Sequence, residues 1–148
     1  MSLRKSIGLN LDAAKNGVRV TIYDDKWVKV KYINGDINTE YRNFYDKIPK
    51  HQRASDDTWY KVLANFGIVD WHPELVTRGD IDPDSTETNV PVPFSPDAAY
   101  KIFKNPEYNA FYRKVLEAAT TAENFYISSL DEVTFPTDAD LKKAASSS

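Results

Sequence analysis

The strongest constraint on the fold is a helix start in the stretch PFSPDAAY at residues 93–100. Ser95 can serve as the N-cap, because its hydroxyl accepts a hydrogen bond from a free backbone N–H of the first turn. Pro96 suits the first helical position, and the carboxylate of Asp97 is stabilised by the positive end of the helix dipole. The sequence therefore predicts a helix that begins at residue 96.

The same start signal returns at Asn105-Pro106-Glu107, so a first helix ends near residue 104 and a second runs to about residue 126. Apolar residues recur along this second helix at every third or fourth position and form one stripe: Tyr108, Phe111, Tyr112, Val115, Leu116, Ala119 and Ala122. Such a stripe has to be buried. The upstream part of the chain must therefore supply a surface for it.

Two segments with strand alternation, 18–23 and 27–32, predict a β-hairpin upstream. A connection of three residues would pair Val20 with Val30 and Ile22 with Val28 on one apolar face. A turn of two residues would instead set Val20 against Lys29. We therefore expect the longer connection, although it lacks the glycine that such a hairpin usually carries.

Capping signals complete a set of four predicted helices, near 38–48, 55–66, 96–104 and 106–126. Asn38 and Ser55 are the expected N-caps of the first two, and Gly67 is expected to end the second in a left-handed conformation. Residues 7–17 read as an extended piece that closes in a turn, and residues 7–11 could form a third short strand.

The predicted fold is therefore α+β and helix-dominant, with an N-terminal β-hairpin at about 18–32 packed on about four helices. We expect one domain over residues 1–130. The stretch 72–92, rich in Pro, Asp, Thr and Gly, is expected to be a long loop that is mobile or ordered by a partner. Residues 131–148 are expected to be a disordered tail.

Composition narrows the classes of function. The chain has no cysteine, so disulfides and thiolate chemistry are excluded, and no apolar run reaches the roughly 18 residues of a membrane span. Residues 1–53 hold 11 Lys and Arg against 6 Asp and Glu, whereas residues 54–148 hold 8 against 16. This asymmetry is consistent with head-to-tail self-association, with a bipolar partner surface, or simply with an unevenly charged solvated surface. Nucleic-acid binding is not favoured, because no recognition motif accompanies the basic half.

Candidate catalytic groups are few. His51 and His72 are typical of surface histidines. Asp80, Asp82 and Asp84 alternate as in a calcium loop, but the glycine and glutamate that such a loop needs are absent. We expect no enzyme, and no catalytic, cofactor or metal site.

Aromatic residues are in surplus, with nine tyrosines, seven phenylalanines and three tryptophans. Tyr23 and Trp27 fall on the hairpin face opposite the Val/Ile face. Either another layer of the domain covers these side chains or they form a partner-binding surface. The partner-binding candidates are Tyr23, Trp27, Trp59, Trp71, Phe94, Tyr112 and Phe125.

The order of motifs resembles that of tail assembly chaperones of tailed bacteriophages. It runs from GVRV at 17–20 through NTEY at 38–41, VDW at 69–71 and VPFSPDA at 92–98 to ENF at 123–125. The resemblance covers about residues 9–127. Two departures are Arg19, where the family commonly has an aromatic residue, and the stretch 72–92, which is longer than usual.

The resemblance implies a non-enzymatic role in the cytoplasm of the host bacterium. Such a chaperone binds the tape measure protein until tail tube protein polymerises around it, and is absent from the mature virion. The family also implies a frameshifted longer form of the same chain as a partner. Binding of a long helical client would use an apolar groove between amphipathic helices. The alternatives are a structural subunit of a phage tail, neck or baseplate, and an unrelated protein-binding adaptor or inhibitor.

Overall fold

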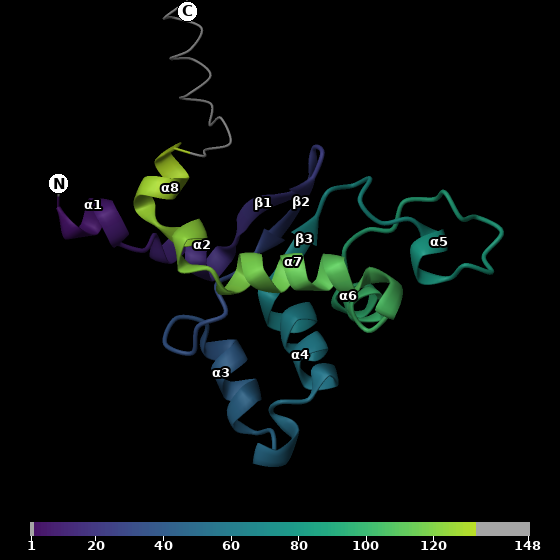
Figure 1. The fold of residues 1–148 in the computed structure, drawn as a ribbon, viewed down its shortest axis with the longest axis horizontal. Helices are drawn as coiled ribbons and strands as arrows, with labels where there is room; N and C mark the ends of the chain where they lie inside the picture. The colour runs from purple at the N-terminus through teal and green to yellow at the C-terminus, as the bar shows by residue number, and fades with distance from the viewer. Residues whose placement is uncertain (1, 133–148) are drawn as a thin grey trace, which may run out of the picture.

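The computed structural model describes residues 2–132, which fold around a three-stranded antiparallel sheet (Figure 1). The strands are β1 (Val18–Tyr23), β2 (Lys26–Val30) and β3 (Ile68–Trp71), in the order β1-β2-β3. Helices make up most of the rest, which confirms the predicted helix-dominant α+β class. The tail expected at residues 131–148 lies, from residue 133 onward, outside the described residues.

The hairpin turns earlier than predicted. Residues 24 and 25 form a two-residue turn in which Asp24 has φ 48°. An irregularity between Thr21 and Tyr23 then shifts the pairing, so that Val20 lies opposite Val28. The predicted partner of Val20 is therefore wrong by two residues. The bulge allows the hairpin to combine a two-residue turn with pairing of apolar residues. The prediction assumed strands paired without a bulge, so it could not include this combination.

The N-terminal segment is helical, not extended as predicted, in two pieces: α1 (Leu3–Ile7) and α2 (Leu11–Asn16). Asn10 caps α2 through its side-chain oxygen, and Gly17 ends it with φ 112°, a conformation that favours glycine. Leu9 forms only an isolated bridge, to Tyr126. The third strand of the sheet is β3 instead. The strand prediction for residues 7–11 failed because three alternating apolar residues are too short a pattern to distinguish a strand from the start of a helix.

The next two predicted helices are present as α3 (Thr39–Asp46) and α4 (Asp56–Val62), joined through a 3-10 turn at Lys50–Gln52. Both predicted N-caps are confirmed. The Asn38 Oδ1 accepts a hydrogen bond of 3.1 Å from the Tyr41 N–H, and the Ser55 Oγ accepts one of 3.2 Å from the Thr58 N–H. A π-helical turn, Leu63–Gly67, continues α4 and leads directly into β3.

Gly67 does not have the predicted left-handed conformation. Its φ is not positive, and the following residue continues as strand. A Cβ atom at Gly67 would lie 2.6 Å from the Cδ1 of Leu63 and 3.2 Å from the Cδ1 of Ile33, both buried side chains. Glycine is therefore favoured here, because any larger residue would have to displace the methyl groups of these packed side chains.

The helix start at residue 96 is confirmed in α6 (Pro96–Phe103), where the Ser95 Oγ accepts a 3.0 Å hydrogen bond from the Ala98 N–H. The helix predicted over 106–126 is divided into three pieces: a 3-10 turn at Pro106–Tyr108, α7 (Asn109–Thr120) and a 3-10 turn at Ala122–Phe125. A last helix, α8 (Ile127–Glu132), closes the described chain.

The end of α7 at Thr120 has a local cause. Thr121 takes an extended backbone, with φ −90° and ψ 107°. Two side chains then donate to carbonyl groups of the last turn: the Thr121 hydroxyl to Glu117 at 2.6 Å and the Asn124 amide to Ala118 at 3.0 Å. These hydrogen bonds replace the backbone hydrogen bonds that a longer helix would have made, so polar side chains stabilise the end of α7.

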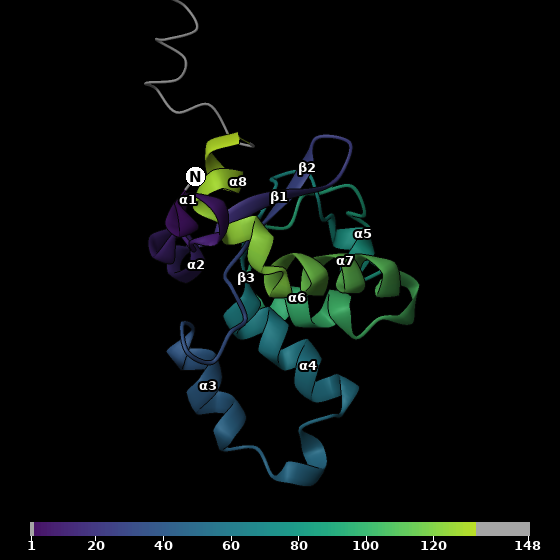
Figure 2. The same ribbon diagram turned by 60° about the vertical axis from the view of Figure 1, so that its left-hand side comes forward.

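The core lies where α7 crosses one face of the sheet, as the two ribbon views show (Figures 1 and 2). The stripe on α7 is turned inward, and the Ile33 N–H donates to the Ala119 carbonyl at 2.8 Å. The largest fully buried side chains are Phe103, Phe125, Leu63, Ile68, Val28, Val30, Val62 and Val115.

The stretch 72–92 is ordered by its own hydrogen bonds around a short helix, α5 (Arg78–Ile81). Thr77 and Asp80 form a capping box at the start of α5, and Thr77 forms an isolated bridge with Pro91. The Arg78 N–H donates to the Val90 carbonyl at 2.8 Å. The stretch therefore forms a loop beside α6 whose two ends are hydrogen-bonded to each other, drawn at the right of Figure 1.

Candidate functional site

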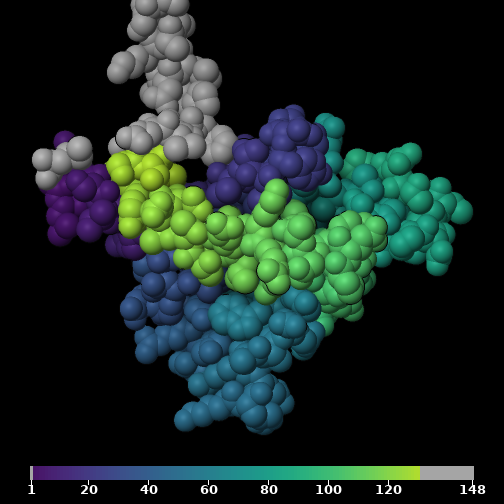
Figure 3. Space-filling model, in the orientation of Figure 1, coloured from purple at the N-terminus to yellow at the C-terminus, as the bar shows by residue number. Residues whose placement is uncertain are grey.

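A groove of about 610 Å³ between α4 and α7 is the candidate binding surface. It is the place where two amphipathic helices adjoin at the surface below the sheet (Figure 3). Trp59 of α4 and Tyr112 and Leu116 of α7 provide its apolar lining. The groove follows from the sequence pattern, because each of these residues belongs to the apolar stripe of its own helix.

The packing of the groove fixes its aromatic residues. Tyr112 is 9 % exposed and makes an edge-to-face contact with Tyr60, with ring centroids 4.8 Å apart. Burial raises the pKa of Tyr112 to about 12, so its hydroxyl remains protonated at neutral pH. Trp59 and Leu116 are half-buried and keep part of their surface open. The groove thus has a firm floor and an accessible apolar side.

Charged residues border the apolar lining. Asp56, Arg113 and Glu117 line the groove and are exposed. An apolar strip with both signs of charge along its edges is complementary to an amphipathic helix that carries charges beside its apolar face.

The aromatic lining continues between α3 and α4. Trp59 lies 6.3 Å from Tyr41 and 6.0 Å from Tyr45, measured between ring centroids, and the two tyrosines lie 5.7 Å apart. The Arg53 guanidinium lies 5.2 Å from the centre of the Tyr45 ring. These ring contacts hold α3 against α4. Burial raises the pKa of Tyr41.

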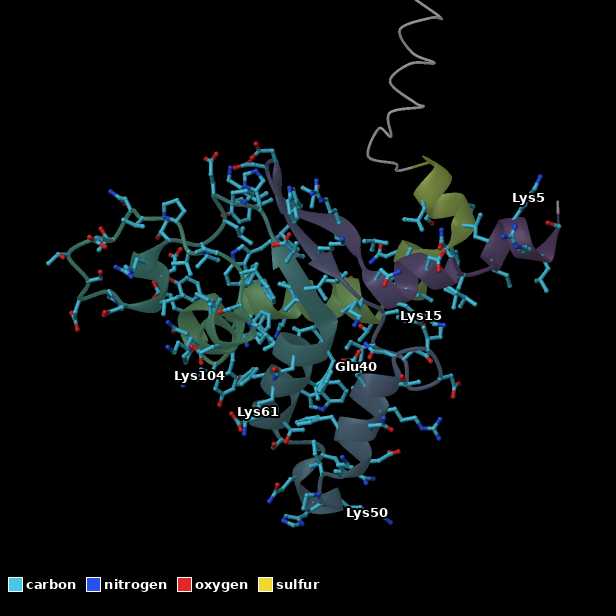
Figure 4. All side chains as sticks on the ribbon, turned by 180° about the vertical axis from the view of Figure 1, so that it is seen from behind. Lys5, Lys15, Glu40, Lys50, Lys61 and Lys104 are labelled. Carbon is cyan, nitrogen blue, oxygen red and sulfur yellow. The ribbon has the colours of Figure 1, made fainter. Side chains whose placement is uncertain are left out.

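Residues 38–62 form a helical arm that projects from the sheet (Figures 1 and 2). Seen from behind, Glu40 lies near its base and Lys50 at its far end (Figure 4). The base is fixed by Asn38, a buried residue whose side-chain amide donates to the Phe66 carbonyl at 2.9 Å. Phe44 packs on Phe66, with ring centroids 5.1 Å apart.

An exposed polar contact joins the arm to α6. The Tyr100 hydroxyl donates to Asp57, and the Lys61 ammonium lies 3.0 Å from the same carboxylate. The hydrogen bond from Tyr100 and the charge of Lys61 lower the pKa of Asp57. The Lys104 ammonium lies 5.0 Å from the centre of the Tyr100 ring, and Figure 4 shows Lys61 and Lys104 on the same side.

The hairpin candidates lie apart from the groove. Tyr23 is 47 % exposed at the end of β1, and its predicted place on the same face as Trp27 is wrong: after the irregularity between Thr21 and Tyr23 it lines a small cavity with Phe111 of α7. Trp27 is half-buried, with the Arg19 guanidinium 4.0 Å from its ring centre and the His72 ring 5.9 Å away edge-on. Trp27 therefore lies on the sheet face opposite α7, where polar neighbours partly cover it, and it does not contact Trp59 or Tyr112.

Three other candidates belong to the packing of the domain. Trp71 is 2 % exposed and donates its indole N–H to the Val92 carbonyl at 2.9 Å, while Phe94, which is half-buried, meets it edge-on at 5.1 Å. Phe125 is fully buried and stacks on Tyr32 at 4.9 Å. Trp71 and Phe125 offer almost no accessible surface, so we do not assign them to a binding surface.

Sequence reasoning missed Leu116 as a groove residue because its place in the α7 stripe indicated core. It also missed the exposed apolar side chains at the N-terminus, Leu3, Ile7 and Leu11, which are 74 %, 56 % and 53 % exposed. Their spacing of four residues was available in the sequence, but the alternation at 7–11 favoured a strand.

Within residues 2–132, no group of three or more His, Asp or Glu side chains is placed to hold a metal ion. His51 is exposed beyond the end of α3, and His72 packs beside Trp27. Over the same residues, no helix is long and apolar enough to cross a bilayer.

Comparison with known proteins gives one family. The family model of the YdaY prophage protein matches residues 28–134, which is more than half of the chain and includes the arm, the groove and β3. Neither the curated proteins nor the solved structures contain a match. On this match, the chain belongs to the family of YdaY prophage proteins.

Proposed function

We propose that this prophage protein is a tail assembly chaperone that binds the helical tape measure protein and keeps it soluble until the tail tube forms. The groove between α4 and α7 is the observation that carries the proposal. The prophage family and the resemblance of the motifs at 17–20, 38–41, 69–71, 92–98 and 123–125 support the same role.

The dimensions of the groove suit one helix of a client. The α7 residues that line the groove run from Tyr112 to Thr120, so at a rise of about 1.5 Å per residue this wall is about 12 Å long. A client helix of about three turns would cover that length and present apolar residues at positions i, i+4 and i+7. Trp59 and Leu116 would contact these residues.

A groove of this size also suits a partner that has to be released. One helix in one groove buries less area than a permanent interface does, so affinity rests on a few anchor side chains. The charged rim of Asp56, Arg113 and Glu117 adds orientation and association rate more than affinity. A chaperone displaced by tail tube protein requires this balance.

The test is co-expression with the tape measure protein encoded in the same prophage. We expect soluble client that co-purifies with the chain. Leu116→Lys, which places a charge in the groove, should weaken binding of the client at least about tenfold, the equivalent of about 1.4 kcal/mol, and so lower the amount of soluble client that co-purifies. Ala110→Lys is the matched control, because Ala110 is exposed on the same helix and does not line the groove.

Two results would contradict the proposal. If the client precipitates in the presence of the wild-type chain, the chain does not act as its chaperone. If mass spectrometry finds the chain in purified virions in stoichiometric amounts, it is a structural subunit of the particle.

A further inference from the structure

A second, smaller cavity of about 150 Å³ lies where the hairpin tip meets the stretch 72–92 and the ends of α6 and α7. These segments adjoin at the upper right of Figure 3. Three aromatic residues line it, Tyr23, Tyr108 and Phe111, together with the aliphatic residues Leu75, Val76 and Ile102. One carboxylate, that of Asp80, stands in this lining.

The carboxylate of Asp80 is held in place by neutral donors. Its Oδ2 accepts hydrogen bonds from the backbone N–H of Thr77 at 2.8 Å and from the Thr77 hydroxyl at 3.2 Å. Its Oδ1 accepts one from the Tyr108 hydroxyl at 3.1 Å. Among residues 2–132, no lysine, arginine or histidine forms a salt bridge with it. The cavity thus holds a fixed negative charge that neutral groups orient.

We propose that this cavity binds the ammonium group of a lysine side chain presented by a partner protein. Aromatic faces attract a cation through their quadrupoles, and the Asp80 carboxylate supplies the opposite charge. The volume is below the range of about 300–1,000 Å³ for sites that enclose a whole small molecule, and it suits one side chain.

The hydrogen bonds select lysine over arginine. A guanidinium binds a carboxylate best through two parallel hydrogen bonds, which need both oxygens free on one edge. Here Thr77 occupies one oxygen of Asp80 and Tyr108 the other. An ammonium group is a compact point charge that needs only one remaining lone pair. Its four-carbon stem would lie along Leu75 and Ile102.

Tyr108 keeps its role as donor over the whole physiological range. Burial, aided by the nearby charge of Asp80, raises the pKa of Tyr108 to about 12. Its hydroxyl therefore stays protonated and continues to donate to Asp80 at neutral pH. The inference is independent of the α4–α7 groove, and it does not require that the partner be the tape measure protein.

The experiment is an NMR titration of the full chain with a blocked lysine, N-acetyl-lysine methylamide. The neutral control is the corresponding blocked norleucine, which has the same stem without the charge. We expect saturable shifts of the Leu75 and Ile102 methyl groups at millimolar concentration. Lysine should bind at least about threefold more tightly than norleucine or blocked arginine. Equal affinity for lysine and norleucine would overturn the proposal.

Two substitutions test the role of the carboxylate. Asp80→Asn keeps the shape and the acceptor for Thr77, and should abolish the preference for lysine over norleucine. Asp82→Asn, at an exposed acid two residues further on, should leave it unchanged. Retained peak dispersion shows that each variant is folded. If Asp82→Asn weakens lysine binding as much as Asp80→Asn does, binding depends on the overall negative charge of this surface and not on the Asp80 carboxylate, and the proposal is wrong.

Two further arms decide the source of the ammonium group and the part of Tyr108. Tyr108→Phe keeps the aromatic face and frees one oxygen of Asp80, so lysine should bind as tightly or more tightly, whereas weaker binding would contradict the assigned geometry. Binding of n-butylammonium without binding of the blocked lysine would overturn the assignment to a protein side chain.

Discussion

Substituting Gly67 tests whether the sharp passage from the arm into β3 depends on close packing. In Gly67→Ala, the new Cβ would lie 2.6 Å from the Cδ1 of Leu63, well inside van der Waals contact, and 3.2 Å from the Cδ1 of Ile33. Leu63 is fully buried and Ile33 is 9 % exposed, so neither can turn into solvent. Overpacking of this kind costs about 1–3 kcal/mol.

The assay is thermal and urea unfolding of the purified chain. A loss of about 2 kcal/mol corresponds to a fall in Tm of about 4–8 °C for a chain of this size. The urea m-value should not change, because the surface exposed on unfolding is nearly the same. Gly35→Ala is the matched control, since the nearest atom to its Cβ would be 3.8 Å away, at Arg42.

The size of the effect should depend on Leu63. Leu63→Ala costs about 2–5 kcal/mol by itself because it empties a buried site, but it also removes the atom that Gly67→Ala would meet. The double variant should therefore be more stable than the sum of the two losses predicts. A Gly67→Ala protein that melts with the wild type would refute the packing argument.

Three other predictions follow from single contacts. Ser95→Ala should destabilise the chain by about 1 kcal/mol in urea unfolding, because it removes the acceptor for the Ala98 N–H, while Ser95→Asp should restore most of the loss. Tyr108 and Tyr112 have folded pKa values of about 12, above the ordinary 10.0, so their protonated forms add stability below pH about 10 that is lost as the pH rises toward 12. An absorbance titration at alkaline pH should show a late step that shrinks in Tyr108→Phe and in Tyr112→Phe; a titration unchanged in both variants would contradict it. Trp27→Ala should cost no more than about 1 kcal/mol, because the half-buried ring loses chiefly its contact with Arg19, and a larger fall in Tm would place the ring in the core.

The helix starts could be predicted from the sequence because capping is local. Ser55 and Ser95 each accept a hydrogen bond from the backbone N–H three residues further on. The capping residue and the bond that it makes therefore fall within one helical turn. The apolar stripe of α7 was equally clear, since a period of three to four residues is a property of the helix itself.

The failures share a different cause, which is contact between distant segments. The bulge between Thr21 and Tyr23 and the strand pairing of β3 depend on partners elsewhere in the chain. The early end of α7 depends on which carbonyl groups Thr121 and Asn124 reach once the chain has turned. Propensity and spacing carry no information on these contacts.

The candidate site was predictable only in part for a further reason. Trp59 and Trp71 are both tryptophans in apolar settings, yet Trp59 keeps surface open in the groove while Trp71 is 2 % exposed. A core and a docking groove require the same residue type at the same spacing, because both exclude water with apolar surface. Only the position of a third element decides between them: Phe94 and Val92 cover Trp71, whereas nothing within residues 2–132 covers the open side of Trp59.

The two proposed sites lie on different sides of α7, and this determines what each experiment can show. Phe111 and Tyr112 are consecutive, so they point about 100° apart around the helix. Phe111 lines the small cavity with Asp80, and Tyr112 lines the groove with Trp59. A charge introduced at Leu116 therefore changes the groove and leaves the cavity unchanged. Removing the charge of Asp80 changes the cavity and leaves the groove unchanged. If Asp80→Asn nevertheless lowers recovery of the tape measure protein while Asp82→Asn does not, the lysine comes from that client; if recovery is unchanged, the cavity serves a different protein.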